Sequence, residues 1–521
     1  MTALLYGHAQ RNTVFRRLPI SQALAHAEPS RHGLRRVYRR ADLVILGIGV
    51  MVGAGIFKLA AEQAAGAAGP AVLLSFVLAG VVCLLSALCY AELASTVPVA
   101  GSAYTYSYIA FGEVIGWLTG WAILLEMLLA VAVVSRAWSL YFSAMLDSFD
   151  VQLPASVADH TGLPTGYDLG NLVILVLIVT VVALGGRLGV RVLWTMVVAK
   201  VAVIAAVILL GFPRVKPSNL TPFIPAAQPG SEEGGRTVLE ALLGQPTQTF
   251  GLIGILGAAA TIAFAYIGFD IVATSAEETR QPRENVGGGM VSGLLIVTGL
   301  YLGVSFVLVG MLPYHRLGSS DTPLPDAFEA VGVSGMGTVV NVGAVIGLTT
   351  VVLVALMGAS RVALAMARDG LLPAPMAAIS PRFRTPAITT LLLGAVAIAA
   401  SQLMNILNYA DLLVLAAVFA FVVVALDVMR LRRSHPELRR GFTVPLYPVV
   451  PVLAVLASLW LMLGVPVKVW VWFAAWMGGG LVIYMLYFRR HSRLSRLIDA
   501  QVEQDRFRAD RDLRHRGVVV R

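Results

Sequence analysis

Long apolar stretches separated by short polar segments make up most of the chain. A helix of about 20 apolar residues, rising about 1.5 Å per residue, crosses the hydrocarbon core of a bilayer. Stretches of that order recur along nearly the whole sequence. The pattern therefore predicts an all-α integral membrane protein with about twelve transmembrane helices, at residues 41–65, 71–94, 114–145, 169–184, 190–212, 252–275, 287–312, 337–366, 387–404, 409–430, 446–465 and 468–488.

Composition agrees with this pattern. Of the 521 residues, 58% are hydrophobic and 13% are charged, whereas soluble domains carry roughly 25% charged residues. We therefore expect a basic N-terminal arm at 1–40, a transmembrane domain at 41–489 and a basic tail at 490–521. The arm lacks a long apolar core with a cleavage site, so we expect no signal peptide, and part of it suits an amphipathic helix on anionic lipid.

The charge distribution predicts orientation. The chain has a formal net charge of +10, and of its 39 Lys and Arg residues 30 fall in the segments on the side of the N-terminus and 5 on the other side. Cytoplasmic segments are enriched in Lys and Arg, so both termini are expected in the cytoplasm of a multi-pass protein of the plasma (inner) membrane. The basic charge then orients the protein and does not indicate nucleic-acid binding. Cys83 and Cys89 share one apolar stretch, six residues apart, which favours neither a disulfide nor a metal site.

Two of the predicted helices carry features that oppose a regular helix. Gly268 and Asp270 lie deep in the sixth stretch, where a glycine weakens the helix and a carboxylate is costly. One interpretation is a broken helix that lines a ligand cavity, and the other is a packing glycine with an Asp bonded to a neighbouring helix. The first stretch is interrupted similarly, by Gly47, Gly49, Gly53 and Gly55. Interruptions five helices apart suggest a five-plus-five inverted repeat with substrate bound between the breaks.

Several short motifs make the predicted class of membrane protein more specific. The segment 89–108 reads CYAELASTVPVAGSAYTYSY, and its Pro and Gly residues end a helix near several interfacial tyrosines. Together with other strings it strongly resembles amino-acid permeases of the amino acid–polyamine–organocation superfamily, and within it the cationic amino-acid transporter family most. The likeness covers residues 41 to about 410, and the other strings are ADL at 41–43, GAG at 53–55, AGP at 68–70, SRAWS at 135–139, AYIGFD at 265–270 and RVALAMARDGLL at 361–372.

The resemblance implies a LeuT-like fold with broken helices 1 and 6 and two extra C-terminal helices. In such a fold the substrate carboxylate meets backbone N–H groups of helix 1, because a helix N-terminus attracts anions. Carbonyls of helix 6, or a gating ring there, meet the α-ammonium. Carried onto this sequence, the first group is Val52, Gly53, Ala54 and Gly55, and the second is Phe264, Ala265 and Ile267.

The sequence departs from the family pattern in two places. Ala54 stands where many members have a hydroxyl residue, and 417–421 (AVFAF) replaces a motif with a hydroxyl and a glycine in the tenth helix. Met357 in the eighth helix offers no counter-charge for a basic side chain. Whether the substrate is cationic or neutral therefore stays open.

Three further ionisable residues inside predicted helices lead to specific expectations. Glu126 is a candidate substrate contact, the alternative being a protonated or paired structural residue. Arg136 is expected to have a structural partner on another helix, since ten residues separate it from Glu126. Lys200 resembles a family lysine on helix five that places its ammonium where sodium-coupled relatives hold an ion, between helices one and eight. It is thus the candidate proton-coupling group, and the alternative is a permanently charged lysine that holds those helices together.

The sequence therefore predicts a secondary active amino-acid transporter, working by alternating access as a proton-coupled uptake system. Its partners are an amino acid and the lipid bilayer, and no cofactor is expected apart from the proton as coupling ion. An enzyme is not expected, because the eight histidines are scattered and form no catalytic or metal-binding cluster. The alternatives are an amino-acid exchanger and a sensor that binds without transporting. The sequence predicts no oligomeric state.

Overall fold

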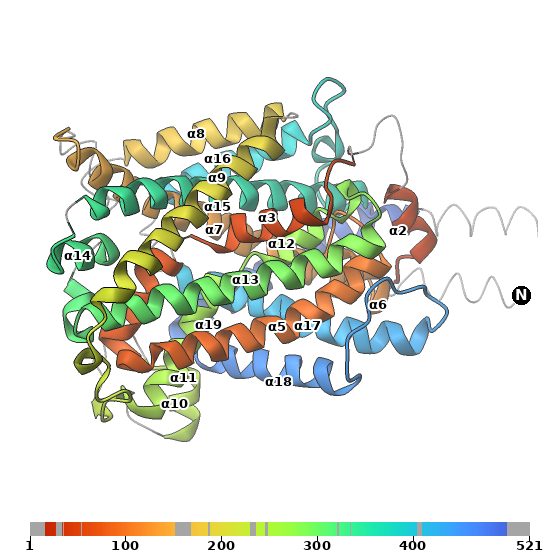
Figure 1. Cartoon of the computed structure of the whole chain (residues 1–521). Helices are drawn as coiled ribbons and strands as arrows, with labels where there is room; N and C mark the ends of the chain where they lie inside the picture. Colours follow the sequence, from red (N-terminus) through yellow and green to blue (C-terminus); the bar gives the residue numbers. More distant parts are fainter. Residues whose placement is uncertain are drawn as a thin grey trace, which may run out of the picture.

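A computed structural model describes residues 16–27, 34, 36–53, 55–151, 168–185, 188–229, 236–244, 248–319, 322–333, 335–403 and 409–496. The described chain is almost entirely helical, and its long helices lie side by side along one direction (Figure 1). The helices are α2 Ile20–Ala27, α3 Arg40–Met51, α4 Ala60–Gln63, α5 Val72–Thr96, α6 Ala103–Ala110, α7 Glu113–Asp147, α8 Leu169–Leu184, α9 Leu188–Gly211, α10 Val238–Leu243, α11 Gly251–Tyr266, α12 Phe269–Thr274, α13 Pro282–Met311, α14 Pro323–Ala330, α15 Met336–Arg368, α16 Ala387–Leu403, α17 Ala410–Ser434, α18 Val449–Leu463, α19 Val467–Ile483 and α20 Arg489–His491, and the strands β1 Gln228–Pro229 and β2 Gln248–Thr249 form a small antiparallel ribbon.

Each apolar stretch of the sequence contains a helix in the structure. Within the described residues, eight helical stretches are long and apolar enough to cross a membrane, and the shorter apolar helices α8, α16 and α18 accompany them. The prediction of an all-α membrane protein is confirmed. The number of spans stays a prediction, because the first stretch is divided between α3 and the irregular turns that follow it, and the sixth between α11 and α12.

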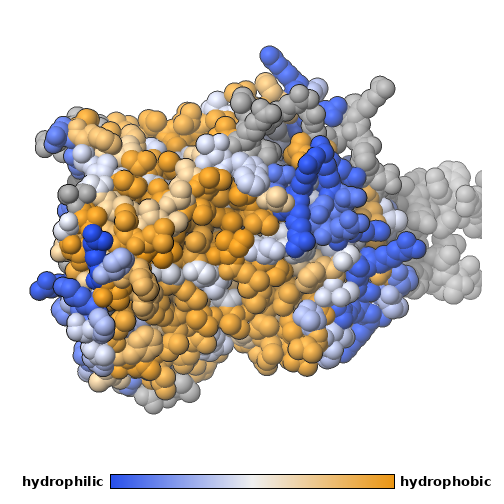
Figure 2. Space-filling view, viewed as in Figure 1, coloured by the Kyte–Doolittle hydropathy of each residue, from blue (hydrophilic) through white to orange (hydrophobic). Residues whose placement is uncertain are grey.

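The outer surface of the bundle is apolar over a broad belt, shown in orange in Figure 2, and exposed Leu, Val and Ile side chains from several helices make up this belt. Such a surface suits lipid tails, whereas soluble monomers rarely expose large contiguous apolar patches. Polar side chains gather at the ends of the bundle. The chain is thus a multi-pass membrane protein.

Helices five spans apart pack against each other. Contacts join α3 with α12, α5 with α13, α7 with α15 and α8 with α16. Each pair takes one helix from the first five predicted spans and one from the next five. The arrangement brings the two interrupted helices together in the middle of the bundle, where the site lies.

One end of the bundle holds α2, α6, the C-terminal end of α17 and residues 484–496, and we call it the arm end (Figure 1). The helix α2 confirms a helix within the N-terminal arm. Ala23 of α2 and Leu18 just before this helix are 1% and 5% exposed, so one side of the arm packs on the protein, and contact of the arm with lipid stays a prediction. The opposite end holds α10 and α14.

The motif at 89–108 connects helices at the arm end. Glu92 is buried and forms ion pairs with Arg432 in the last turn of α17 and with Arg440 of the segment after this helix. The hydroxyl of Tyr104 donates to Asp369, which directly follows α15, at 2.8 Å. The motif therefore holds three parts of the bundle in register. Cys83 and Cys89 are both buried and free.

Candidate functional site

The first helix breaks where its glycines contact other helices of the bundle. The helix α3 ends at Met51, and Val52 leaves the helical conformation with φ −74° and ψ 95°. A π-helical turn begins at Gly55. A Cβ on Gly55 would lie 2.4 Å from the Cβ of Ala265 and 2.8 Å from its Cα, so α11 approaches this backbone only because the residue is glycine.

The second break faces the first. Ile267 is extended, and Gly268 has φ 116°, a left-handed conformation that side chains rarely adopt. A Cβ on Gly268 would lie 2.7 Å from a methyl of Val50. At each break a glycine therefore packs closely against the other helix, and the backbone departs from a regular helix at Ile267 and Gly268.

Tyr301 ties the two breaks together. Its hydroxyl lies 2.6 Å from the carbonyl oxygen of Met51 and 2.7 Å from that of Ala265. Carbonyls freed by a helix break need such partners inside the membrane. Sequence reasoning missed this residue, although it is the one tyrosine in α13 and its phenol requires a partner there.

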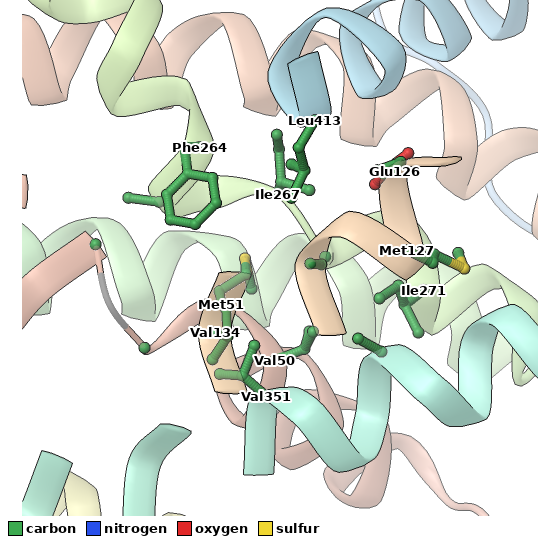
Figure 3. A pocket seen from close by; sticks show the side chains of 16 residues that line it. Val50, Met51, Glu126, Met127, Val134, Phe264, Ile267, Ile271, Val351 and Leu413 are labelled. Carbon is green, nitrogen blue, oxygen red and sulfur yellow. The ribbon is translucent and has the colours of Figure 1, made fainter. Parts of the chain in front are cut away.

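A cavity opens between the two breaks (Figure 3). It is lined mainly by apolar side chains, with Phe264 and the carboxyl group of Glu126 on opposite sides in the view of Figure 3. Small, largely apolar cavities with few polar groups are typical of small-molecule sites. The lining residues are Val50, Met51, Gly53, Gly55, Glu126, Met127, Ala130, Val134, Phe264, Ala265, Ile267, Gly268, Ile271, Val351, Ala355 and Leu413.

The structure thus places most of the candidate residues at one cavity. Gly53, Gly55, Phe264, Ala265 and Ile267 line it, as does Glu126. Ala54 lies outside the described residues.

Val52 has other contacts in the structure. Its N–H donates to the carbonyl of Ile48 at 3.1 Å, and its carbonyl accepts from Lys200 at 2.9 Å. Its N–H is therefore not available to a carboxylate in this conformation. The spacing of the glycines could not reveal this, because the break falls after Val52 and not before it.

Glu126 has a buried carboxyl group at the cavity. It is 1% exposed, and neither of its oxygens has a hydrogen-bond partner among the described residues. Asp270 of α12 is its electrostatic neighbour, is also 1% exposed and has one oxygen without a partner. Two neighbouring buried carboxyl groups ionise together only with a compensating cation. This side of the cavity therefore suits a proton or a cationic group.

Lys200 lies beside the first break and not in the cavity lining. Its side chain is fully buried, and its ammonium donates to the carbonyls of Gly49 at 2.8 Å and Val52 at 2.9 Å and to Oγ1 of Thr350 at 2.9 Å. An ammonium has three hydrogens, so all are used. The hydroxyl of Thr350 also lies 2.8 Å from the carbonyl of Gly49. The lysine thus joins α9, the end of α3 and α15. Thr350 was missed, because a threonine in an apolar helix carries no distinctive signal.

Arg136 bonds to helices away from the cavity. Its Nε donates to the carbonyl of Ser401 at 2.8 Å, and its guanidinium lies 3.9 Å from the carboxylate of Asp168. The expectation of a structural partner on another helix is confirmed.

Comparison with known proteins points to one class. A model of the amino acid permease family matches residues 40–487. The chain is 37% identical to the methylthioribose transporter of Bacillus subtilis (strain 168) over 487 residues, which are 93% of this chain and 100% of that protein. It is 36% identical to the branched-chain amino acid permease BcaP of the same organism over 489 residues, with the same coverage. It is also 36% identical to the cationic amino acid transporter 4 of Mus musculus, over 77% of this chain and 61% of that protein.

Proposed function

Since this chain belongs to the amino acid permease family of the amino acid–polyamine–organocation superfamily, we propose that it is a secondary active transporter that couples amino-acid uptake to proton entry. The relatives reported above are transporters and permeases, and the chain is likewise a transport protein and not an enzyme. The observation that carries the coupling is the ammonium of Lys200, which bonds the broken end of α3 to α15.

The coupling follows from charge and burial. A charged ammonium forms hydrogen bonds with two buried carbonyls and a buried hydroxyl, and so holds α3 and α15 together. When the ammonium loses its proton, one of these hydrogen bonds is lost and the junction weakens. A proton taken up on one side of the membrane and released on the other then alternates the junction between tight and loose states.

The substrate backbone is proposed to bind between the two breaks. The carboxylate meets the turn at Gly53 and Gly55, where N–H groups at the start of a helical turn favour an anion. The α-ammonium meets the carbonyl side of the other break, at Phe264, Ala265 and Ile267. No charged side chain is needed at either position, in agreement with the apolar lining.

The side chain of the substrate is proposed to be uncharged and apolar. Met51, Met127, Ile271, Val351 and Leu413 supply a lining that gains from burying apolar groups. A relative named for branched-chain amino acids fits this choice. The second candidate is a cationic amino acid, favoured by the unpartnered carboxyl group of Glu126 and by the relative named for such substrates.

The fold is proposed to be LeuT-like, with a five-plus-five inverted repeat followed by two further helices, α18 and α19. The packing of α3 with α12, α5 with α13, α7 with α15 and α8 with α16 supports it, because equivalent helices of two inverted halves meet at their shared axis. The basic arm end is proposed to face the cytoplasm of a plasma (inner) membrane, by the enrichment of Lys and Arg there.

Reconstitution tests the proposal. Purified protein in empty liposomes should accumulate a labelled branched-chain amino acid when the outside is acidified, whereas an exchanger needs internal amino acid and a sensor accumulates none. The variant Lys200→Met should bind substrate but lose the dependence of accumulation on the pH gradient. Lys58→Met is the matched control, because Lys58 is partly exposed and pairs with Glu62 at 3.5 Å. Accumulation by Lys200→Met that still follows the pH gradient would show that the proton takes another route.

A further inference from the structure

The two terminal segments of the described chain meet at the arm end. Arg16 precedes α2 and is only 3% exposed, although it belongs to a polar arm. Its guanidinium Nη2 donates to Oε1 of Glu113 at 3.2 Å and to the carbonyl of Arg489 at 3.0 Å. One side chain thus connects the N-terminal arm, the start of α7 and the C-terminal segment.

Glu113 is the centre of this junction. It is fully buried and accepts hydrogen bonds from the hydroxyls of Tyr108 at 2.9 Å, Tyr484 at 3.0 Å and Ser492 at 3.0 Å, in addition to that from Arg16. Its backbone N–H donates to the carbonyl of Arg16 at 2.8 Å. The carboxylate therefore binds donors from both ends of the described chain at once.

The arm covers a second cavity, which is lined partly by charged side chains. Arg368 and Glu277 form an ion pair of 3.2 Å there, and Asp369 accepts from Tyr104. The backbone N–H of Arg493 donates to the carbonyl of Asp369 at 2.8 Å, so the C-terminal segment also closes on this cavity. The lining residues are Leu18, Ala23, Val99, Ala100, Gly101, Thr105, Glu277, Ala365, Arg368 and Asp369.

The position of this cavity suggests its role. Glu277 follows α12, and Ile271 of this helix borders the substrate cavity, so the covered cavity lies along the chain from the second break toward the arm end. A substrate that leaves at the arm end has to pass the ends of α12 and α15. With α2 and residues 484–496 in place, this passage is covered.

The junction is strong but incompletely satisfied. A buried ion pair with further hydrogen bonds is costly to break from one side only. However, Nε of Arg16 is buried without a hydrogen-bond partner among the described residues. An unsatisfied buried N–H disfavours the closed arrangement. Such a contact is better suited to a closure that has to open than to a permanent anchor.

We propose that residues 16–27 and 484–496 form a clasp that closes the arm-end mouth of the transport path, with the contact between Arg16 and Glu113 as its lock. Opening at this end then requires the lock to break. The inference rests on the proposed transport function for its purpose, whereas its test measures only access to the covered cavity.

The test uses a reporter cysteine in the full-length protein. Ala100 lines the covered cavity and is 1% exposed, so Ala100→Cys places the reporter thiol there. Cys83→Ala and Cys89→Ala remove the native thiols. Labelling by a membrane-impermeant maleimide is followed from each side of the membrane. Arg16→Ala should speed labelling from the arm end by about tenfold or more, since it leaves the carboxylate of Glu113 without its cation. Arg17→Ala is the matched control, because Arg17 is exposed, and it should label as slowly as the parent.

A second pair of variants separates the lock from general damage. Glu113→Gln should speed labelling as Arg16→Ala does, and the double variant should label no faster than either single one, because both remove the same contact. Arg16→Lys, which keeps the charge, should restore most of the slow labelling. Equal labelling of Arg16→Ala, Arg17→Ala and the parent, in protein that elutes as one monodisperse peak, would overturn the clasp. If Arg16→Ala does not fold, unchanged labelling of Glu113→Gln overturns it. Absence of uptake by the parent protein in liposomes would contradict the proposed transport function, and the labelling rates would still test the clasp.

Discussion

Two glutamates of the same helix, Glu113 and Glu126, lie in opposite surroundings. Both are buried on α7. Glu113, at the arm end, accepts hydrogen bonds from four side chains, including Arg16. Glu126, at the cavity, accepts none among the described residues. A carboxyl group that is saturated with donors holds structure together, and one that is left without donors at a cavity is available to a ligand or a proton.

The same contrast extends to the two regions around them. At the arm end Arg361 donates to Glu278 at 2.6 Å and to Ser275 at 2.8 Å, and Arg368 pairs with Glu277. In the middle of the bundle the two breaks meet through close approaches of glycine backbone and through the hydroxyl of Tyr301, which lies between two carbonyls. The ammonium of Lys200 bonds to the backbone beside the first break. Ion pairs thus hold the arm end together, whereas close packing holds the two breaks together. Substitutions that add atoms should damage the middle, and substitutions that remove charge should damage the end.

The largest effect is expected at the second break. Gly268→Ala places a Cβ 2.7 Å from Val50 at a φ of 116°, which costs about 1–3 kcal/mol in strain and displaces the break from the cavity. We expect uptake into liposomes to fall by about 100-fold, with protein still inserted in the membrane. Gly257→Ala in α11 is the control, because nothing lies within 4 Å of its Cβ position. Normal uptake by Gly268→Ala would mean that the substrate binds elsewhere.

A smaller effect is expected from Glu126, and it is selective. Glu126→Gln keeps the shape of the side chain and removes its charge, so binding of Arg and Lys should weaken by about tenfold while that of Ala and Leu changes little. Competition of each amino acid against a labelled substrate, on purified protein, measures the ratio. An equal loss for basic and neutral amino acids would instead assign Glu126 a structural role.

The smallest effect concerns Asp369 at the covered cavity. Burial raises the pKa of its carboxyl group to about 6, against about 3.9 in an unfolded chain. Between these values the folded protein binds more protons than the unfolded one, so this group makes stability fall as the pH rises from about 4 to about 6. Asp369→Asn removes the contribution, and the loss of Tm across that range should shrink by about 1–3 °C in detergent. An identical pH profile in the variant would show that the carboxyl group does not titrate there.

Sequence reasoning predicted some of the site and missed other parts for identifiable reasons. The glycines at 53, 55 and 268 were informative because a glycine in an apolar helix signals close approach or irregular backbone. Glu126 and Lys200 stood out because charge is rare in such helices. Tyr301 and Thr350 did not, since hydroxyl groups are common in membrane helices, and the engaged N–H of Val52 depends on where the break falls.

The sequence by itself determined the class of the protein, the approximate helix positions and the two interruptions, because burial in lipid demands long apolar segments and leaves each exception visible. Only the tertiary structure decided which groups meet. Lys200 is separated along the chain from both Gly49 and Thr350, and Arg16 lies far along the chain from Glu113 and farther still from Arg489. The packing of whole helices determines these partners, because it brings residues that are distant in sequence within about 3 Å of each other. The local sequence pattern does not indicate which residues will meet.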